Sequence, residues 1–283
     1  MSAAVAEKER EFRFNDKEFR YLAGVVKDHA GIVLADHKKD MVYSRLARRL
    51  RALKLSSFED YCALLESEGA ADEMGMFINA ITTNLTRFFR EPHHFEHLAE
   101  VMPRKFQNAP TATRIRIWSA GCSSGEEPYS IAMTMAECLP RLAAYDFRIL
   151  ATDLDTSMVA HAARGVYRMS DADGLSKTRI GKWTLRERAA DSIAMNPVLK
   201  ERITFKHLNL LRDWPMKGKF DVIFCRNVMI YFDGPTKDRL LRRLSDHLVP
   251  GGWLYIGHSE TILDQQSCHL VPRGKTIYEK VVA

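Results

Sequence analysis

Apolar residues recur at helical spacing along the first part of the chain, and no segment there has the alternation that is typical of a strand. Phe19, Leu22 and Val26 share one face of such a helix. Asn15 precedes them as a residue that commonly caps a helix, and Gly31 follows where the helix would end. The pattern therefore predicts a first helix between Asn15 and Gly31.

Three more helices are predicted farther along the same part of the chain. Ser57 and Asp60 form a capping sequence before an apolar run, and Pro92 suits the first turn of the last of these helices. Their apolar faces comprise Tyr61, Leu64 and Leu65, then Met74, Phe77, Ile78 and Ile81, then Phe95, Leu98 and Met102. We predict an all-helical N-terminal domain over residues 12–85, followed by a linker helix within residues 86–110.

After Pro110 the pattern changes to short apolar strands that alternate with helices, which is typical of a parallel α/β sheet. The predicted strands span residues 114–118, 147–152, 203–205, 220–225, 253–257 and 276–282, and one helix spans residues 235–248. Residues 166–200 are polar, rich in turn residues and weakly periodic, so we expect them to form an insertion. The prediction is an α/β domain over residues 111–283.

Composition narrows the class of protein only a little. The net charge of +6 and the pI of about 9.0 favour an acidic partner, which could be nucleic acid, anionic lipid or a carboxylate-rich protein surface. Five scattered cysteines without a C-x-x-C pair indicate neither a disulfide framework nor a thiolate zinc site. The chain lacks a signal-peptide core and any run of about 18 apolar residues. We therefore expect a cytoplasmic protein that does not insert into a membrane.

A turn of small residues follows the first predicted strand of the α/β part and opens a helix. Small residues let a ligand approach the backbone at Gly121 and Gly125, and the helix N-terminus offers free N–H groups. Glu126 and Glu127 begin this helix, and their negative charge would repel a pyrophosphate. A cationic ligand without phosphate, S-adenosylmethionine, fits better. By themselves these residues also allow another nucleotide site or a tight turn in which the glutamates only cap the helix.

Polar residues follow two other predicted strands. Asp153 ends the second strand, where an acidic residue commonly binds the hydroxyls of a ribose. Arg226, Asn227 and Tyr231 follow the apolar strand that ends at Cys225. Because the carboxyl ends of parallel strands face one crevice, all four side chains are candidates for the site. Tyr231 could instead be an ordinary half-buried tyrosine.

The segment 82–90, between the helical and the α/β parts, alternates polar with large apolar residues. It could bury two phenylalanines while directing Asn84, Thr86 and Arg90 into a cleft, since domain junctions favour ligand sites. The alternative is a capped helix end followed by surface arginines.

Together these segments resemble the CheR family of chemoreceptor methyltransferases. The sequences TTNLTRFFRE, SAGCSSGEEPYSIAM, ATDLDT and FCRNVMIYFD occur in the order of that family, and the resemblance spans about residues 12–280. It implies a small helical domain and a Rossmann-like S-adenosylmethionine-dependent methyltransferase domain that bears a small antiparallel β-subdomain. The implied reaction forms glutamate methyl esters on chemoreceptors and leaves S-adenosylhomocysteine, without a metal.

The resemblance also implies roles for particular residues. By motif match, the contacts to the cofactor are Asn84, Thr86, Arg90, Glu126, Asp153, Asn209, Leu210, Arg226 and Asn227. Arg90 and Tyr231 match residues that position the substrate. Only the alignment favours Glu126 over Glu127, so their order of importance stays open. Cys122 stands where relatives often carry alanine, which could make the site sensitive to thiol reagents.

The implied partner is the cytoplasmic helical domain of a membrane chemoreceptor. Lys38, Arg45, Arg48 and Arg49 can share one side of a predicted helix and dock on an acidic receptor helix. The alternatives for this basic stripe are a solvated face or a nucleic-acid surface, although interleaved aromatic residues are missing. Whether a receptor C-terminal peptide binds the β-subdomain stays open, as do the receptor's identity and the oligomeric state.

Two short sequences suggest other chemistry. His93, His94 and His97 lack the H-E-x-x-H order of zinc proteases, so we predict a solvated helix start and no metal. His258, Ser259 and Glu260 resemble a triad only as letters, and a turn after a strand is the better interpretation.

Two other classes of protein compete with the methyltransferase. A non-catalytic adaptor is disfavoured because Asn84, Arg90, Asp153 and Tyr231 are all present. A nucleic-acid methyltransferase is disfavoured because no N-P-P-Y-like sequence follows the strand that ends at Cys225.

Overall fold

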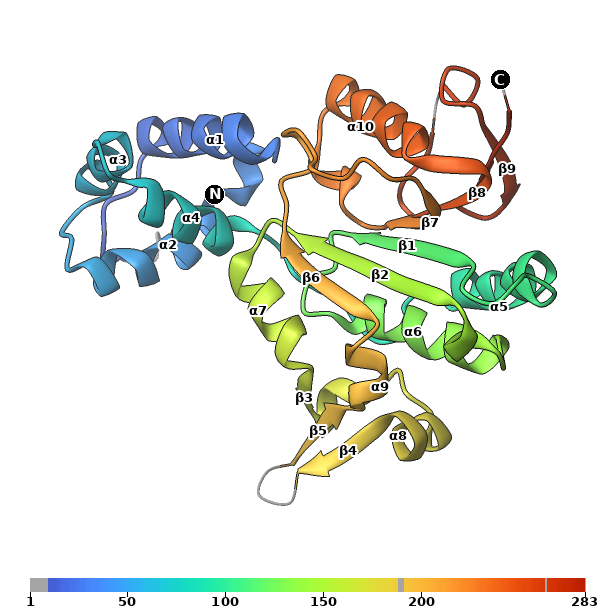
Figure 1. The fold of residues 1–283 in the computed structure, drawn as a ribbon. Coiled ribbons are helices and arrows are strands. Elements are labelled where there is room, and N and C mark those ends of the chain that lie inside the picture. The colour runs from blue at the N-terminus through green and yellow to red at the C-terminus, as the bar shows by residue number, and fades with distance from the viewer. Residues whose placement is uncertain (1–9, 188–190, 263, 283) are drawn as a thin grey trace, which may run out of the picture. The chain divides into compact units, whose positions relative to one another are not determined.

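The structure is a computed structural model that describes residues 10–187, 191–262 and 264–282 (Figure 1). Residues 188–190, within the predicted insertion, and the first nine residues lie outside the described part. The chain divides into two compact units, one that ends at Thr82 and one that begins at Thr83. Among the described helices, none is both long enough and apolar enough to cross a membrane.

All regular secondary structure in the described residues of the first unit is helical, as predicted. Its α-helices are α1 (Asp16–Ala30), α2 (Lys39–Leu53), α3 (Phe58–Glu66) and α4 (Ala71–Ile81), and a 3₁₀ turn at Asp36–Lys38 precedes α2. The side chain of Asn15 accepts from the backbone of Lys17 and Glu18, and Glu18 accepts in return from the Asn15 amide. Gly31, at φ 70°, ends α1. Both caps were predicted from sequence, and so was the cap of α3 by Ser57.

The second unit is built on a seven-stranded sheet in the order β6-β2-β1-β7-β8-β10-β9. The strands are β1 (Arg114–Ala120), β2 (Asp146–Asp153), β6 (Ile203–His207), β7 (Phe220–Cys225), β8 (Leu248–Ile256), β9 (Leu270–Gly274) and β10 (Ile277–Lys280). The first five in this spatial order are parallel, and β10 is antiparallel to both of its neighbours. The predicted α/β fold is therefore confirmed.

Helices cover both faces of this sheet, so its central strands are apolar on both sides. Ile115 and Ile117 of β1 pack with α5 (His93–Phe106) and α6 (Glu126–Cys138) in one cluster. Trp118 packs in a second cluster with α10 (Gly234–Asp246), on the opposite side of the sheet (Figure 1). Packed side chains therefore cover both faces of the central strands.

The insertion carries a separate antiparallel sheet in the order β3-β5-β4. Its elements are β3 (Val166–Arg168), α8 (Lys177–Trp183), β4 (Thr184–Glu187) and β5 (Ser192–Met195), followed by the short α9 (Pro197–Lys200). This confirms the small antiparallel β-subdomain that the resemblance implied. The strands are three or four residues long, and such short strands leave little periodicity to detect.

Two elements differ from the sequence-based expectation. Helix α5, expected as a linker, packs against α6 within the second unit and contributes Phe95, Leu98 and Met102 to its core. Strand β9 was missed, because proline, arginine and glycine interrupt its apolar pattern. It pairs with β10 as a hairpin.

Candidate functional site

The strand order of the sheet reverses at β1, and this reversal marks where a ligand is expected. From β1 the chain continues to β2 on one side and later returns to form β7 on the other side. In such sheets ligands bind outside the carboxyl ends of the strands at this reversal. The loops after β1, β2, β6 and β7 all lie at that edge, and each carries predicted site residues.

The turn after β1 requires its two glycines. Gly121 has φ 85°, and a Cβ there would lie 2.3 Å from Cγ2 of Val228 in the loop after β7. Gly125, the N-cap of α6, has φ 102° and would clash with Ala162 and Tyr167. The Tyr167 hydroxyl of β3 also donates to the Ser124 carbonyl. Close packing on both sides, together with the positive φ angles, explains why small residues occupy this turn.

Buried carboxylates surround this turn. Asp153 is 9% exposed and accepts from the backbone amides of Ser123 (2.7 Å) and Asp155 (2.9 Å). Glu126 is 6% exposed and accepts from the Ser124 hydroxyl. Burial raises the pKa of both carboxyls because the charged form loses hydration. A cationic ligand at this edge would restore a favourable environment for their charged forms.

Glu127, unlike Glu126, is bound by protein side chains at both carboxylate oxygens. Ser119 donates to Oε1 (2.7 Å), and Nη1 of Arg226 donates to Oε2 (3.1 Å). Arg226 also donates through Nη2 to the carbonyl of Arg90, and its Nε has no hydrogen-bond partner among the described residues. This difference favours Glu126 as the acid that faces a ligand. It also gives the Arg226 guanidinium a role that the motif match did not predict, which is to hold the backbone at Arg90.

A connector, defined here as residues 83–91, runs past these loops. Asn84 donates from Nδ2 to Oδ2 of Asp155 (2.7 Å), and its carbonyl accepts from the Ser123 hydroxyl (2.8 Å). Arg90 donates from Nη1 to the Leu85 carbonyl (2.9 Å). The structure thus brings Asn84 and the backbone of Arg90 to the loops that follow β1, β2 and β7. Thr86 lies between them and is half-buried.

The remaining predicted residues follow β6 and β7. Asn209 accepts from the Leu211 amide in a tight turn, whereas Leu210 is buried in the core around Trp118. Asn227 adopts a left-handed conformation at φ 59°. Tyr231 ends a 3₁₀ turn and is half-buried, as the alternative interpretation allowed.

Cys122 is 1% exposed, and burial together with nearby carboxylates raises the pKa of its thiol well above the usual value. The thiolate is the reactive form, so burial and the raised pKa both argue against the sensitivity to thiol reagents that was considered from sequence.

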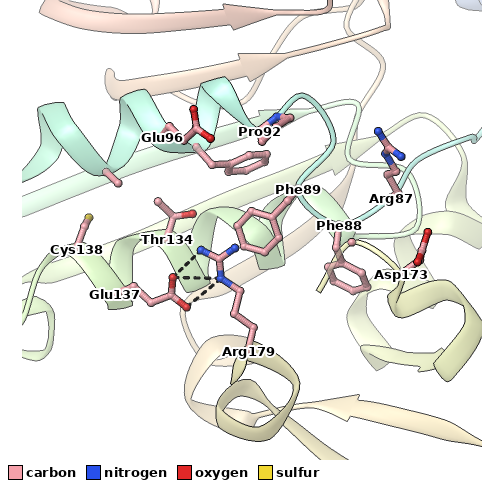
Figure 2. Close-up of a pocket in the computed structure, with 13 residues that line it drawn as sticks. Arg87, Phe88, Phe89, Pro92, Glu96, Thr134, Glu137, Cys138, Asp173 and Arg179 are labelled. Carbon is pink, nitrogen blue, oxygen red and sulfur yellow. Dashed lines mark hydrogen bonds and ion pairs between the residues drawn. The ribbon is translucent and has the colours of Figure 1, made fainter. Parts of the chain in front are cut away.

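A cavity of about 640 Å³ lies on the other side of the connector, between α5, α6 and the β-subdomain. Figure 2 shows Phe88 and Phe89 pointing into it, with Arg179 bonded to Glu137 (2.8 Å). The Arg179 guanidinium lies 3.8 Å from the centre of the Phe89 ring. None of the predicted cofactor residues lines this cavity, so it is distinct from the site expected at the strand ends.

The histidines after Pro92 are not a solvated helix start, so that prediction was wrong. His94 is buried and its Nε2 lies 2.9 Å from the Thr276 hydroxyl, and Nδ1 of His97 lies 2.9 Å from the Tyr255 hydroxyl. Ligand atoms of Glu91, His93 and His94 lie within 4.8 Å of one another. However, the Arg226 guanidinium is 3.6 Å from the Glu91 carboxylate and would repel a metal ion there.

The basic stripe of the first unit divides into two kinds of residue. Arg45 donates to the carbonyls of Ile81 (2.6 Å) and Thr82 (2.7 Å) at the end of α4. Arg49 forms a two-point ion pair with Glu73, which also accepts from Tyr61. Lys38, in the 3₁₀ turn before α2, and Arg48 are exposed. The proposed docking face is thereby reduced to Lys38 and Arg48, because Arg45 and Arg49 bind groups of their own unit.

We expect Arg49→Ala to destabilise the helical unit, because Glu73 would keep a buried charge without its partner. Loss of a partner by a buried polar group costs at least about 1 kcal/mol. Thermal unfolding measures the effect, with Arg48→Ala as a matched arginine on the same helix. Equal melting temperatures for the two variants would contradict a structural role for Arg49.

Three features define the class of protein to which the second unit belongs. They are the glycine turn flanked by acids, the aspartate at the end of β2 and the strand reversal between β1 and β7. The second unit is an S-adenosylmethionine-dependent methyltransferase domain of Rossmann-like topology. The family model "CheR methyltransferase, SAM binding domain" matches residues 84–276, and "CheR methyltransferase, all-alpha domain" matches residues 17–82. The chain belongs to the CheR methyltransferase family.

Curated relatives agree with this assignment. A "Probable chemotaxis protein methyltransferase" of Rhizobium etli is 45% identical over 241 residues, which cover 84% of this chain and 90% of the relative. A "Chemotaxis protein methyltransferase" of Klebsiella aerogenes is 43% identical over 279 residues, 98% of this chain and 93% of the relative. That of Escherichia coli is 42% identical over 267 residues, 93% and 91% of the two chains.

Several residues of the site were missed from sequence. Asp155 binds Asn84 of the connector, Glu260 binds the loop after β7, and Glu91 forms an ion pair with Arg226. Glu91 directly follows the predicted Arg90, and Asp155 lies two residues after the predicted Asp153. Glu91 and Asp155 lie within the quoted sequences TTNLTRFFRE and ATDLDT, and this was the available signal for them. Glu260 lies outside those sequences, and the loop after β7 that it binds is 30 to 33 residues earlier in the chain.

Proposed function

We propose that this protein transfers a methyl group from S-adenosylmethionine to glutamate side chains of membrane chemoreceptors, which yields glutamate methyl esters and S-adenosylhomocysteine. The observation that carries the proposal is the convergence, at the strand reversal, of buried acids with a connector that presents Arg90. Buried acids suit a cationic nucleoside, and an arginine suits an acidic acceptor.

The residues at the strand ends fit S-adenosylmethionine by their chemistry. Gly121 and Gly125 leave the backbone accessible, and the acidic start of α6 disfavours a phosphate. Asp153 is proposed to bind the ribose hydroxyls, and Glu126 the positively charged amino acid portion. Asn84, Thr86, Asn209, Leu210, Arg226 and Asn227 complete the proposed set of cofactor contacts.

The reaction requires little proton transfer from the protein. When bound, S-adenosylmethionine supplies a methyl group on a sulfonium. A glutamate carboxylate, with an ordinary pKa of about 4.3, is already ionised at neutral pH and needs no general base. The protein must therefore hold the carboxylate in line with the methyl group and exclude water, and such positioning supplies several kcal/mol.

Arg90 and Tyr231 are proposed to perform this positioning. Arg90 belongs to a connector whose backbone is tied to Arg226, and its guanidinium has one described contact, with a carbonyl. A single guanidinium orients a carboxylate, although a strong two-point pair would reduce its nucleophilicity. Tyr231 contributes a hydroxyl as a hydrogen-bond donor rather than as a base.

The chemoreceptor as substrate is supported by the relatives, which are named chemotaxis protein methyltransferases. We propose that the acceptor glutamates lie in the receptor's helical cytoplasmic domain, and that the enzyme acts in the cytoplasm. The net charge of +6 suits an acidic receptor surface. A receptor C-terminal peptide at the β-subdomain would add a second contact.

Transfer of labelled methyl from S-adenosylmethionine to receptor-containing membranes tests the proposal. We expect label in the receptor that is released as methanol by mild base, because esters hydrolyse and methylated amines do not. Membranes without receptor, and nucleic acid, serve as alternative acceptors. Label that enters nucleic acid instead would favour the competing class, and no transfer to any acceptor would favour a non-catalytic adaptor.

Reversing the two exposed charges, in Lys38→Glu with Arg48→Glu, should slow receptor methylation at low salt and matter less at high salt. Exposed charges act mainly on encounter with an acidic partner and are screened by ions. Methylation rates at two ionic strengths measure this, with affinity for S-adenosylhomocysteine in parallel.

The matched control is Lys17→Glu with Arg20→Glu, which makes the same change of net charge at exposed positions of α1. Equal rates for the two double variants would contradict docking through Lys38 and Arg48.

A further inference from the structure

Glu260 is a buried carboxylate that lies outside the sequences that carry the family resemblance. It is 6% exposed and follows β8 in a turn. Its Oε2 accepts from the backbone amides of Gly257 (2.6 Å) and Asn227 (3.0 Å), and its Oε1 accepts from the amide of Ile230 (3.3 Å). Both oxygens are therefore committed to backbone N–H groups, two of which belong to the loop after β7.

The loop after β7 needs such support. Asn227 has φ 59°, a conformation that L-residues other than glycine seldom adopt. Gly257 packs directly against it, because a Cβ at Gly257 would lie 2.4 Å from Nδ2 and 2.7 Å from the amide nitrogen of Asn227. Hydrogen bonds to Glu260 and the close packing of Gly257 thus hold one short segment, from Arg226 to Tyr231.

The same turn after β8 also contacts the connector. The backbone amide and Nδ1 of His258 lie 3.3 Å and 3.1 Å from Oε1 of Glu91. Glu91 follows Arg90, and Arg226 donates to the Arg90 carbonyl. Residues 257–260 therefore join the segment that carries Arg90 to the segment that carries Tyr231.

We propose that Glu260 is a positioning residue for methyl transfer, which sets the backbone of residues 227–231 so that Asn227 meets the cofactor and Tyr231 meets the acceptor. This inference rests on the proposed function. Glu260 does not touch the reacting atoms, and it acts through the amides that it binds.

A carboxylate suits these three backbone N–H groups better than a side-chain amide does. Two anionic oxygens can accept several N–H groups at once, whereas a glutamine side chain presents one oxygen and one NH₂ donor. In Glu260→Gln the NH₂ group would face an amide N–H, so at least one of the three bonds is lost. Glu260→Asp keeps the charge and both acceptors on a shorter side chain.

The experiment compares Glu260→Gln, Glu260→Asp and Gly257→Ala with the full-length wild type. Gly257→Ala displaces the same Asn227 backbone by steric contact and leaves the carboxylate intact. For each variant, kcat and KM for receptor methylation and Kd for S-adenosylhomocysteine are measured well below the melting temperature. Ser245→Ala is the control, because it removes a buried hydrogen bond, to the Cys268 carbonyl, away from this loop.

We expect Glu260→Gln and Gly257→Ala each to lower kcat by about 10- to 100-fold, as small displacements of positioning groups do. Both should weaken binding of S-adenosylhomocysteine. Their combination should be less than additive, because both act on one backbone segment. Glu260→Asp should recover part of kcat, whereas Ser245→Ala should lower the melting temperature only.

Wild-type kcat and Kd in Glu260→Gln would overturn the inference, and so would losses that match its unfolded fraction. Failure of the wild type to methylate receptors would overturn the proposed function instead. The affinity for S-adenosylhomocysteine would then still decide on Glu260, because unchanged Kd values in both loop variants would contradict its role.

Discussion

Replacing Arg90 by alanine should lower kcat for receptor methylation by about 100- to 1,000-fold, the range observed when one preorganised donor is removed from a reaction site. Folding should change little. The guanidinium has one described hydrogen bond, to the Leu85 carbonyl, and the connector is held by backbone contacts through Arg226 that the variant keeps. Initial rates and thermal melts on the same preparations measure both quantities.

Arg87→Ala is the matched control for Arg90→Ala, since it removes an exposed arginine from the same connector. It should retain turnover close to wild type. Arg90→Lys should fall between the two, because lysine keeps the charge and loses the planar fork of donors. A large drop in melting temperature for Arg90→Ala, with normal turnover per folded molecule, would mean that Arg90 is structural.

Replacing Asp153 by asparagine should raise the Kd for S-adenosylhomocysteine by roughly 10- to 150-fold. Hydrogen bonds to charged groups contribute about 1.5–3 kcal/mol, and each 1.4 kcal/mol is a factor of about ten. The variant also loses charge where the carboxylate binds the amides of Ser123 and Asp155, so the turn before α6 is less well held. Titration calorimetry on the purified protein measures the change.

Asp146→Asn provides the comparison for Asp153→Asn. Asp146 begins the strand that Asp153 ends, and it pairs with Arg116 at the amino end of the strand, away from the site. Product affinity in Asp146→Asn should equal that of the wild type. If Asp153→Asn binds the product as tightly as Asp146→Asn does, the assignment of Asp153 to the ribose is wrong.

Local signals were sufficient for most of the fold. The caps of α1 and α3 depend on residues within a few positions, and the sequence predicted both. The central strands are apolar on both faces and end at polar residues. The same pattern therefore predicted where these strands lie in the sequence and at which of their ends the site is located. The antiparallel β-subdomain came from the family resemblance, since its short strands carry too few residues for a pattern.

Long-range partners could not be predicted in this way. Arg45 and Arg49 look like surface cations on α2, yet their partners are 24 to 37 residues away on α4 and at its end. Arg226 and Glu127 are 99 residues apart. Whether a charged side chain faces solvent or a buried partner depends on which helices pack together, and a helical pattern does not specify that.

The most direct test of the central claim is to locate the methyl group on the acceptor. A receptor incubated with the wild-type protein and S-adenosylmethionine is digested, and its peptides are mapped by mass spectrometry before and after treatment with mild base. The account predicts added methyl groups on glutamates of the helical cytoplasmic domain, lost on base treatment and absent when those glutamates are replaced by alanine. Base-stable methyl groups on lysine or arginine, or methylation confined to nucleic acid, would contradict it.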